Sequence, residues 1–260
     1  MTNFLQKRKS VREFKKTIAP ISEIEKIKDY ISNIEEVEDV KFMFYENGKL
    51  IYEGLDGKAG YSGVMIKAPH YIAVKTIGEN ELNLIDTGYY LEKLNTFLVE
   101  SGFDTCWITV DEVEISTMKG LFGGDGDKIS YLIGFGYGVG KKLFKPETVS
   151  SRKDLNEIVF KDNLNNPISI EELENYGLLD ILSSVRYAPS HMNFQPWRFV
   201  VKEGEIEIYM DKSSKDSRSL VDMGIVMYYF EEMAKTIGIN KKWNIELKDG
   251  DFLYIGNFKM

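Results

Sequence analysis

The sequence has one cysteine, two histidines and no long hydrophobic run. The single cysteine, Cys106, excludes an internal disulfide framework and is typical of a reducing compartment. With only His70 and His191 beside it, a standard structural zinc site is excluded, and no metal is expected. The sequence contains no stretch of about eighteen apolar residues, so no membrane span is expected. The first residues lack the apolar core of a secretory signal. We expect a cytoplasmic protein.

Positive charge is also scarce. Lys and Arg number 33 against 41 Asp and Glu, which gives a net charge of −8. A general nucleic-acid binder needs a clustered basic face, so no nucleic-acid partner is expected. A local basic pocket for a small anion remains compatible with this balance. The 260 residues, 43% hydrophobic, are enough for a sizeable core, either as one large domain or as two fused halves.

A weak internal repeat organises the chain. Pro20-Ile21-Ser22 is predicted to open a helix with a capping box of Ser22 and Glu25, and residues 167–169 open a second one with Ser169 and Glu172. Each helix is followed by a predicted hairpin: FMFYENGKLIY with its turn at Asn47-Gly48, and FVVKEGEIEIY with its turn at Glu203-Gly204.

The repeat is clearest in two long apolar segments, LIDTGYYLEKLNTFLVESGFDTCW (84–107) and LVDMGIVMYYFEEMAKTIGINKKW (220–243). Each predicts a buried helix that ends at a glycine, Gly102 or Gly238, and the simplest burial is against its own copy. Each half then closes with an apolar strand, YLIGFGYG or FLYIGNF. Two similar segments without common descent remain the alternative interpretation.

The predicted elements favour an α+β fold, with mixed or antiparallel sheets flanked by helices and two pseudo-symmetric halves, residues 1–162 and 163–260. Neither half could bury its apolar helix alone, so together they would form one compact unit. We therefore expect a monomer that acts as a pseudo-dimer.

A basic cluster, RKSVREF, begins at Arg8. If this segment is extended, alternation places Arg8, Ser10 and Arg12 on one face. Two guanidinium groups and a hydroxyl suit a dianionic phosphate. A solvated, basic N-terminal surface is the alternative interpretation.

A second cluster, APSHMNFQPWRF (188–199), contains two prolines that restrict the backbone. Ser190, Asn193 and Gln195 then project polar groups from a rigid loop that could satisfy a flat polar heterocycle. The alternative is a helix-to-strand connection with Trp197 in the core. A third segment, GFDTCWITV (102–110), predicts a helix cap followed by a strand, with Cys106 as an inert apolar side chain.

Taken in order, RKSVREF, GFDTCWI, LIGFGYG, SRKDLNEIVF and APSHMNFQPWRF resemble the signatures of the FMN-dependent nitroreductase family, of which the QPW loop is the most specific. In the family pattern the basic motif and the QPW loop lie close together in sequence. Here they fall in different halves of the chain. Because the family binds each FMN between two subunits, this departure resembles a dimer fused in sequence and reduced to one working site.

The resemblance implies roles for individual residues. Arg8, Ser10 and Arg12 would hold the FMN phosphate and ribityl chain, together with Arg152. The isoalloxazine ring would be bordered by Pro189, Ser190, Asn193 and Gln195, while His191 stands where the pattern has serine. Thr109 and Val110 occupy the positions whose backbone amides lie near flavin N5, where the family often has glycines.

The implied activity is hydride transfer from NADH or NADPH through FMN to a small aromatic or quinone-like acceptor. No protein acid or base is needed in that scheme, so no catalytic residue is predicted. Two alternatives remain open at this point: another flavin reaction of the same superfamily, such as dehalogenation or dehydrogenation, and a flavin-binding or storage module without turnover.

Overall fold

The structure, a computed structural model, describes residues 9–260 except 39, 61–62, 76–79, 141–150 and 215–216. None of the described helices is long and apolar enough to cross a membrane. By its internal contacts the chain divides into two compact units. Of the described residues, the N-terminal unit holds 9–83 and 91–140, and the C-terminal unit holds 84–90 and 151–260. The proposed origin of the chain from two halves, 1–162 and 163–260, stays a prediction.

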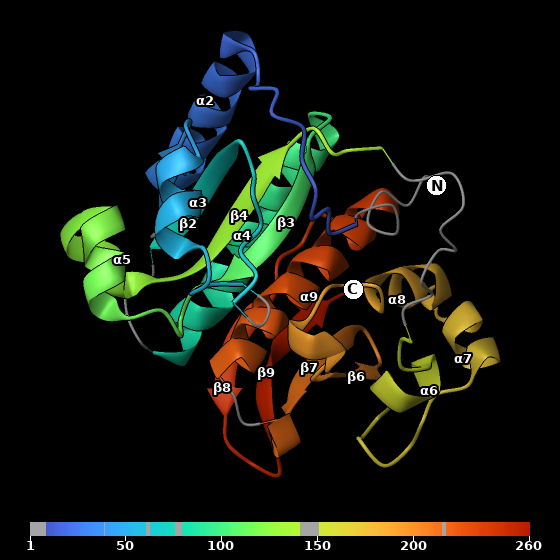
Figure 1. The fold of residues 1–260 in the computed structure, drawn as a ribbon. Helices are drawn as coiled ribbons and strands as arrows, with labels where there is room; N and C mark the ends of the chain where they lie inside the picture. Colours follow the sequence, from blue (N-terminus) through green and yellow to red (C-terminus); the bar gives the residue numbers. More distant parts are fainter. Residues whose placement is uncertain (1–8, 39, 61–62, 76–79, 141–150, 215–216) are drawn as a thin grey trace. The chain divides into compact units, whose positions relative to one another are not determined.

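The N-terminal unit is built on an antiparallel sheet whose strands run in the order β1-β2-β4-β3. These strands and their helices appear in blue to green in Figure 1. In chain order the elements are α2 (Ile21–Val37), β1 (Lys41–Tyr45), α3 (Lys49–Leu55), β2 (His70–Lys75), α4 (Glu81–Glu100), β3 (Asp104–Thr109), α5 (Ile115–Phe122), the 3-10 turn η1 (Gly123–Lys128) and β4 (Ile129–Gly136).

The core of this unit lies where α3 and α5 meet one face of the sheet. Ile51, Leu55, Met118 and Phe122 pack there against Leu132 of β4. In α3 the two buried side chains are four residues apart, the spacing of one helix face. The burial of this face explains why the chain continues after β1 as a helix.

Two expectations for this region were wrong. Residues 42–52 do not form a hairpin, because Asn47-Gly48 leads from β1 into α3 rather than into a second strand. The predicted capping box of Ser22 and Glu25 is also absent: α2 begins at Ile21 directly after Pro20, and no side chain caps it. Ser22 is therefore inside the first turn, too late in the sequence to serve as the cap.

The C-terminal unit contains a mixed sheet in the order β5-β6-β7-β9-β8, in which β5 and β6 are parallel and the other pairs antiparallel. Figure 1 shows it in yellow to red. The elements are α6 (Leu155–Ile158), β5 (Val159–Lys161), α7 (Ile170–Asn175), α8 (Leu179–Val185), η2 (His191–Asn193), β6 (Trp197–Lys202), β7 (Glu205–Asp211), η3 (Lys212–Ser214), α9 (Ser217–Thr236), β8 (Asn244–Lys248) and β9 (Phe252–Lys259). The two units together confirm the predicted α+β class.

The predicted hairpin in this unit is confirmed: β6 and β7 pair in register, with Lys202 opposite Glu205 and the turn at Glu203-Gly204. Gly204 has φ +75°, a conformation that favours glycine. Along β7, buried and half-buried residues alternate strictly, so one face of the hairpin lies on the core.

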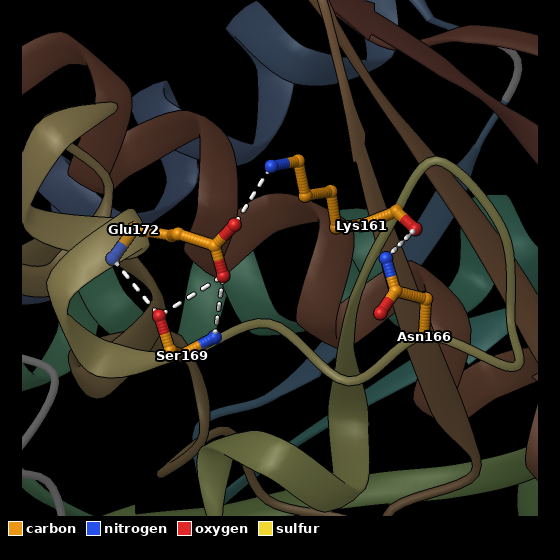
Figure 2. A network of polar contacts seen from close by, with 4 residues as sticks. All are labelled: Lys161, Asn166, Ser169 and Glu172. Carbon is orange, nitrogen blue, oxygen red and sulfur yellow. Dashed lines mark hydrogen bonds and ion pairs between the residues drawn. The ribbon is translucent and has the colours of Figure 1, made fainter.

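The second capping box is also confirmed. The Ser169 hydroxyl accepts from the Glu172 amide at 3.2 Å, and the Glu172 carboxylate accepts from the Ser169 amide at 3.1 Å (Figure 2). Lys161 adds an ion pair to the same carboxylate at 2.7 Å. The hydrogen bonds and charge of Lys161, with the hydrogen bonds of Ser169, hold the pKa of Glu172 at about 2, so the carboxylate stays ionised in the folded chain.

Both long helices form as predicted, and both end in the same way. After α4, the Gly102 amide donates to the Val99 carbonyl and the Phe103 amide donates to the Leu98 carbonyl. After α9, Gly238 and the next residue repeat the pattern. The two glycines share φ +87°. These are the bonds of a Schellman motif, which satisfies the last carbonyls of a helix.

Within the C-terminal unit, residues 84–90 of α4 cross α9 with the two backbones in contact. A Cβ on Gly88 would lie 1.9 Å from the Val221 carbonyl oxygen, and a Cβ on Gly224 would lie 1.8 Å from that of Ile85. The contact is reciprocal, since Ile85 and Val221 hold equivalent places in the repeat, as do the two glycines. The two helices therefore pack on each other as predicted, while their origin as a repeat and the symmetry of the halves stay predictions.

Candidate functional site

The loop between α8 and β6 has an unusual backbone. Met192, Asn193 and Gln195 adopt positive φ angles of 46°, 61° and 49°. Such angles are uncommon outside glycine and cost free energy unless the surroundings enforce them. Concentrated strain of this kind is typical of functional loops, and here it falls within the polar segment APSHMNFQPWRF.

The polar side chains of this loop are engaged in holding it. Ser190 Oγ accepts from the Gln195 amide at 3.0 Å, and Asn193 Nδ2 donates to the Ser151 carbonyl at 2.6 Å. Gln195 is only 1% exposed, and its Oε1 accepts from the Lys153 amide at 3.1 Å. Ser190 and Asn193 are half-buried, as is Pro189. The contact of these residues with a flavin ring stays a prediction, and Gln195 serves the loop in this structure.

Helix α9 anchors the same loop at its start. Both carboxylate oxygens of Asp222 accept from the His191 amide at 3.0 Å, and Arg218 Nη1 lies 3.1 Å from His191 Nε2. Asp222 was not predicted as a site residue. The signal was present in the repeat, because Asp222 and Asp86 occupy matching positions of LVDMG and LIDTG.

Cationic groups surround the other end of the loop. The Gln195 carbonyl accepts from Arg198 Nη1 at 3.2 Å and from Lys153 Nζ at 3.3 Å. Arg198 also pairs with Asp211 at 2.8 Å. Burial, with a smaller contribution from the Arg198 charge, lowers the pKa of Lys153. Sequence reasoning missed Lys153 and Arg198, because nothing local distinguishes them from surface charges.

Arg152, by contrast, was predicted and lies at this loop. Its Nη1 donates to the Ala188 carbonyl at 2.9 Å, so the guanidinium reaches the residue before Pro189. The C-terminal unit thus holds Arg152, predicted with the phosphate residues, beside the four residues predicted for the ring, which are Pro189, Ser190, Asn193 and Gln195.

The remaining predicted residues belong to the N-terminal unit. Ser10 forms a parallel bridge with Thr105, and the Val11 amide donates to the Thr105 carbonyl at 2.9 Å. The segment is therefore extended at this point, as predicted, and Ser10 and Arg12 are exposed. Arg8 lies outside the described residues.

Thr109 and Val110 lie at the end of β3 in the same unit. Thr109 is half-buried, while Val110 is 1% exposed and belongs to the core. The Val110 amide donates to the Ser130 carbonyl at 2.9 Å. The placement of this pair near flavin N5 stays a prediction.

Comparison with known protein families decides the identity of the chain. Residues 1–234 match the model of a family described as "Putative TM nitroreductase". The chain belongs to this nitroreductase family. The match spans both units and all five motifs on which the resemblance rested, and it confirms that resemblance. Nitroreductases are oxidoreductases, and the family assigns this general class.

A solved structure with a TM-score above 0.5 supports the fold. A protein from Thermotoga maritima described as a "putative nitroreductase" has a TM-score of 0.63 and 23% identity, covering 98% of this chain and 93% of its own. An FMN-dependent nitroreductase from Clostridium difficile has a TM-score of 0.44 and 19% identity, covering 55% and 90%. The FMN-dependent nitroreductase NfnB from Mycobacterium smegmatis, in complex with NADPH, has a TM-score of 0.42 and 13% identity, covering 52% of this chain and 86% of its own. The curated proteins contain no match.

Proposed function

We propose that the protein is an FMN-dependent oxidoreductase that transfers hydride from NADH or NADPH to a small aromatic or quinone-like acceptor. The observation that carries this proposal is the strained loop at residues 190–195 in a chain that belongs to the nitroreductase family. Hydrogen bonds from α9 and from the segment 151–153 hold this loop in place. A connection that served only to join α8 to β6 would not need three left-handed residues.

Each unit has residues that suit one part of FMN. In the N-terminal unit, Ser10 and Arg12 are exposed on an extended segment, and a hydroxyl with a guanidinium matches the acceptor oxygens of a phosphate. In the C-terminal unit, Ser190 and Asn193 are half-buried on the loop. The Ser190 hydroxyl can donate and the Asn193 side-chain carbonyl can accept, which fits the polar edge of a flat heterocycle.

When bound, FMN supplies the hydride chemistry. The chain's own residues bind and orient it. Asp222 fixes the start of the loop through the His191 amide, and Lys153 and Arg198 fix its end through the Gln195 carbonyl. Arg198 is paired with Asp211, so Lys153 would supply the positive charge beside the loop and would favour a cofactor that carries negative charge. No side chain is assigned an acid or base step.

A second candidate, a flavin-binding module without turnover, is favoured by Thr109 and Val110. Both carry side chains at positions where the family often has glycine, and the Val110 amide is already bonded to Ser130. Because the Val110 side chain lies in the core, only the half-buried Thr109 side chain would narrow the space over the flavin in which a nicotinamide would stack.

Absorption spectroscopy separates the two candidates. The purified protein, reconstituted with FMN, is mixed without oxygen with NADH and then with NADPH. Bleaching of the flavin band by either one supports the oxidoreductase, and a stable yellow complex supports the binding module. Failure of FMN to bind at all would contradict both.

Matched variants then test the phosphate assignment. Arg12→Ala removes a charge-assisted contact and should weaken FMN binding by about 1.5–3 kcal/mol. Lys9→Ala, from a neighbouring exposed position on the other face, should change it little. Equal small effects of the two variants would mean that this segment is solvated surface and does not bind the phosphate.

A further inference from the structure

The N-terminal unit contains a cleft of about 570 Å³ that shares Arg12, and no other residue, with the set assigned to FMN. Three stretches of chain line it: residues 12–18 before α2, residues 46–53 around the start of α3, and residues 67–69 before β2. A volume of this order is typical of sites for small organic molecules.

A buried histidine joins the three stretches. His70 Nε2 accepts from the Ala19 amide at 3.0 Å, at the end of the first stretch. On the other side of the ring, Nδ1 lies 2.6 Å from the Glu46 carbonyl, at the start of the second stretch. His70 itself comes directly after the third. A neutral ring with its proton on Nδ1 satisfies both bonds, so the walls of the cleft are fixed with respect to one another.

Part of the lining is apolar and aromatic. Phe14, Tyr52 and Pro69 all border the cleft. Close packing behind Pro69 depends on Gly136 of β4, where a Cβ would lie 2.4 Å from Pro69 Cγ and 3.6 Å from the Phe14 ring. The glycine strand of the sequence motif thus places two apolar walls of the cleft.

The rest of the lining is rich in positive charge, although the chain as a whole has a net charge of −8. Its cations are Arg12, Lys15, Lys16, Lys49 and Lys67, against the carboxylates of Glu13, Glu46 and Glu53. The Glu53 carboxylate lies 3.8 Å from Lys49, so these two lining charges offset each other, and Glu46 pairs with Lys28 from α2. The remaining lining cations still outnumber the remaining carboxylate, Glu13. Lys67 Nζ lies 4.8 Å from the centre of the Tyr52 ring, so a cation and an aromatic face occur together.

We propose that this cleft binds a small aromatic anion, with its ring against Phe14, Tyr52 and Pro69 and its negative group beside Lys67. Apolar walls with a few convergent charges are the usual composition of a small-molecule site. The ligand would be held by residues of the N-terminal unit alone.

Calorimetric titration of the full chain with 2-naphthoate tests the proposal. Saturable binding is expected below about 1 mM, both without FMN and with FMN at saturation. The neutral isostere 2-naphthamide lacks the charge and should bind at least tenfold more weakly. Inorganic phosphate lacks the ring and should also bind at least tenfold more weakly.

Three variants locate the binding. Lys67→Met should weaken 2-naphthoate binding about tenfold, the loss of one charge-assisted contact. Tyr52→Leu should weaken it through loss of the aromatic face. Lys58→Met, an exposed lysine of the same unit that does not line the cleft, is the control and should leave binding unchanged.

Several results would overturn the proposal. Absence of saturable binding would do so, as would equal affinities for 2-naphthoate and its amide. Equal effects of Lys67→Met and Lys58→Met would place the ligand elsewhere. Displacement of 2-naphthoate by FMN would show that the probe occupies the flavin site instead, and tight binding of phosphate alone would show that the apolar walls contribute nothing.

Discussion

Residues 41–55 and residues 197–211 both begin with a strand that runs into a glycine, and they differ in the element after that glycine. After Gly204 the chain turns back as β7, whereas after Gly48 it coils into α3. The residues of the second element explain the difference. EIEIY places apolar side chains at every second position, as a half-buried strand requires. KLIYEGL places its two buried side chains, Ile51 and Leu55, four residues apart.

The two glycines also serve different purposes. Gly204 has φ +75° and an open surrounding, so it is needed for its backbone conformation. Gly48 has φ −73°, which any residue adopts, but a Cβ there would lie 2.6 Å from the Ala68 carbonyl oxygen and from the Tyr71 ring. Two segments that look alike in sequence can therefore keep a glycine for backbone conformation in one case and for close packing in the other.

The largest loss of stability is expected at the crossing of α4 and α9, where the two predicted repeat segments are most alike. Gly88→Ala and Gly224→Ala would each press a Cβ to within 2 Å of a carbonyl on the facing helix. Each should lower the free energy of unfolding by about 3 kcal/mol or more. Urea denaturation measures this, with Gly120→Ala as the control.

Gly120 lies in α5 with open space around its Cβ position. Alanine there should raise stability by up to about 1 kcal/mol. If the crossing variants were as stable as the control, the close contact between residues 84–90 and α9 would be wrong.

A smaller loss of stability is expected at Gly48 and Gly204, the glycines that follow β1 and β6. Gly48→Ala should cost about 1–3 kcal/mol, because its Cβ meets backbone that cannot move freely. Gly204→Ala should cost about 1–2 kcal/mol, from the left-handed conformation alone. Replacement by asparagine distinguishes the causes: it should recover part of the loss at 204, where the strain is conformational, and none at 48. The same thermal or urea unfolding experiment measures all four variants.

The two predicted caps provide a further contrast. Ser169→Ala removes a formed capping box and should cost about 1 kcal/mol. Ser22→Ala should be nearly neutral, because Ser22 lies within α2 and caps nothing. Equal losses at both sites would mean that α2 begins later than the structure shows.

The smallest effect expected is a pH dependence confined to the N-terminal unit. Burial lowers the pKa of His70 below its ordinary value of 6.5, although Glu46 opposes the shift. The stability that neutral His70 contributes is therefore complete above about pH 6.5 and is lost as the pH falls towards the lower folded-state value. The midpoint of unfolding, measured above and below pH 6.5, should change more in the wild type than in His70→Gln. An equal change in both proteins would contradict this assignment.

Local signals were enough to predict much of the fold. The glycine ends of α4 and α9, the Glu203-Gly204 hairpin and the Ser169 cap each depend on residues close together in sequence. The helix at residues 49–55 was missed because Asn-Gly is a strong turn signal, and the contact of Gly48 with residues 68–71 that holds the backbone is a tertiary one. In the candidate site, the motif match located Arg152 and the loop, but Asp222, Lys153 and Arg198 reach that loop from elsewhere in the chain.

The central claim is that one chain carries one flavin, since only the first half contains RKSVR and only the second contains APSHMNFQPW. The measurement is the amount of FMN released on denaturation of saturated, gel-filtered protein, divided by the amount of chain. We predict one FMN per chain. Two per chain would show that each half is a complete flavin site, and none would contradict the assignment of the protein as a flavoprotein.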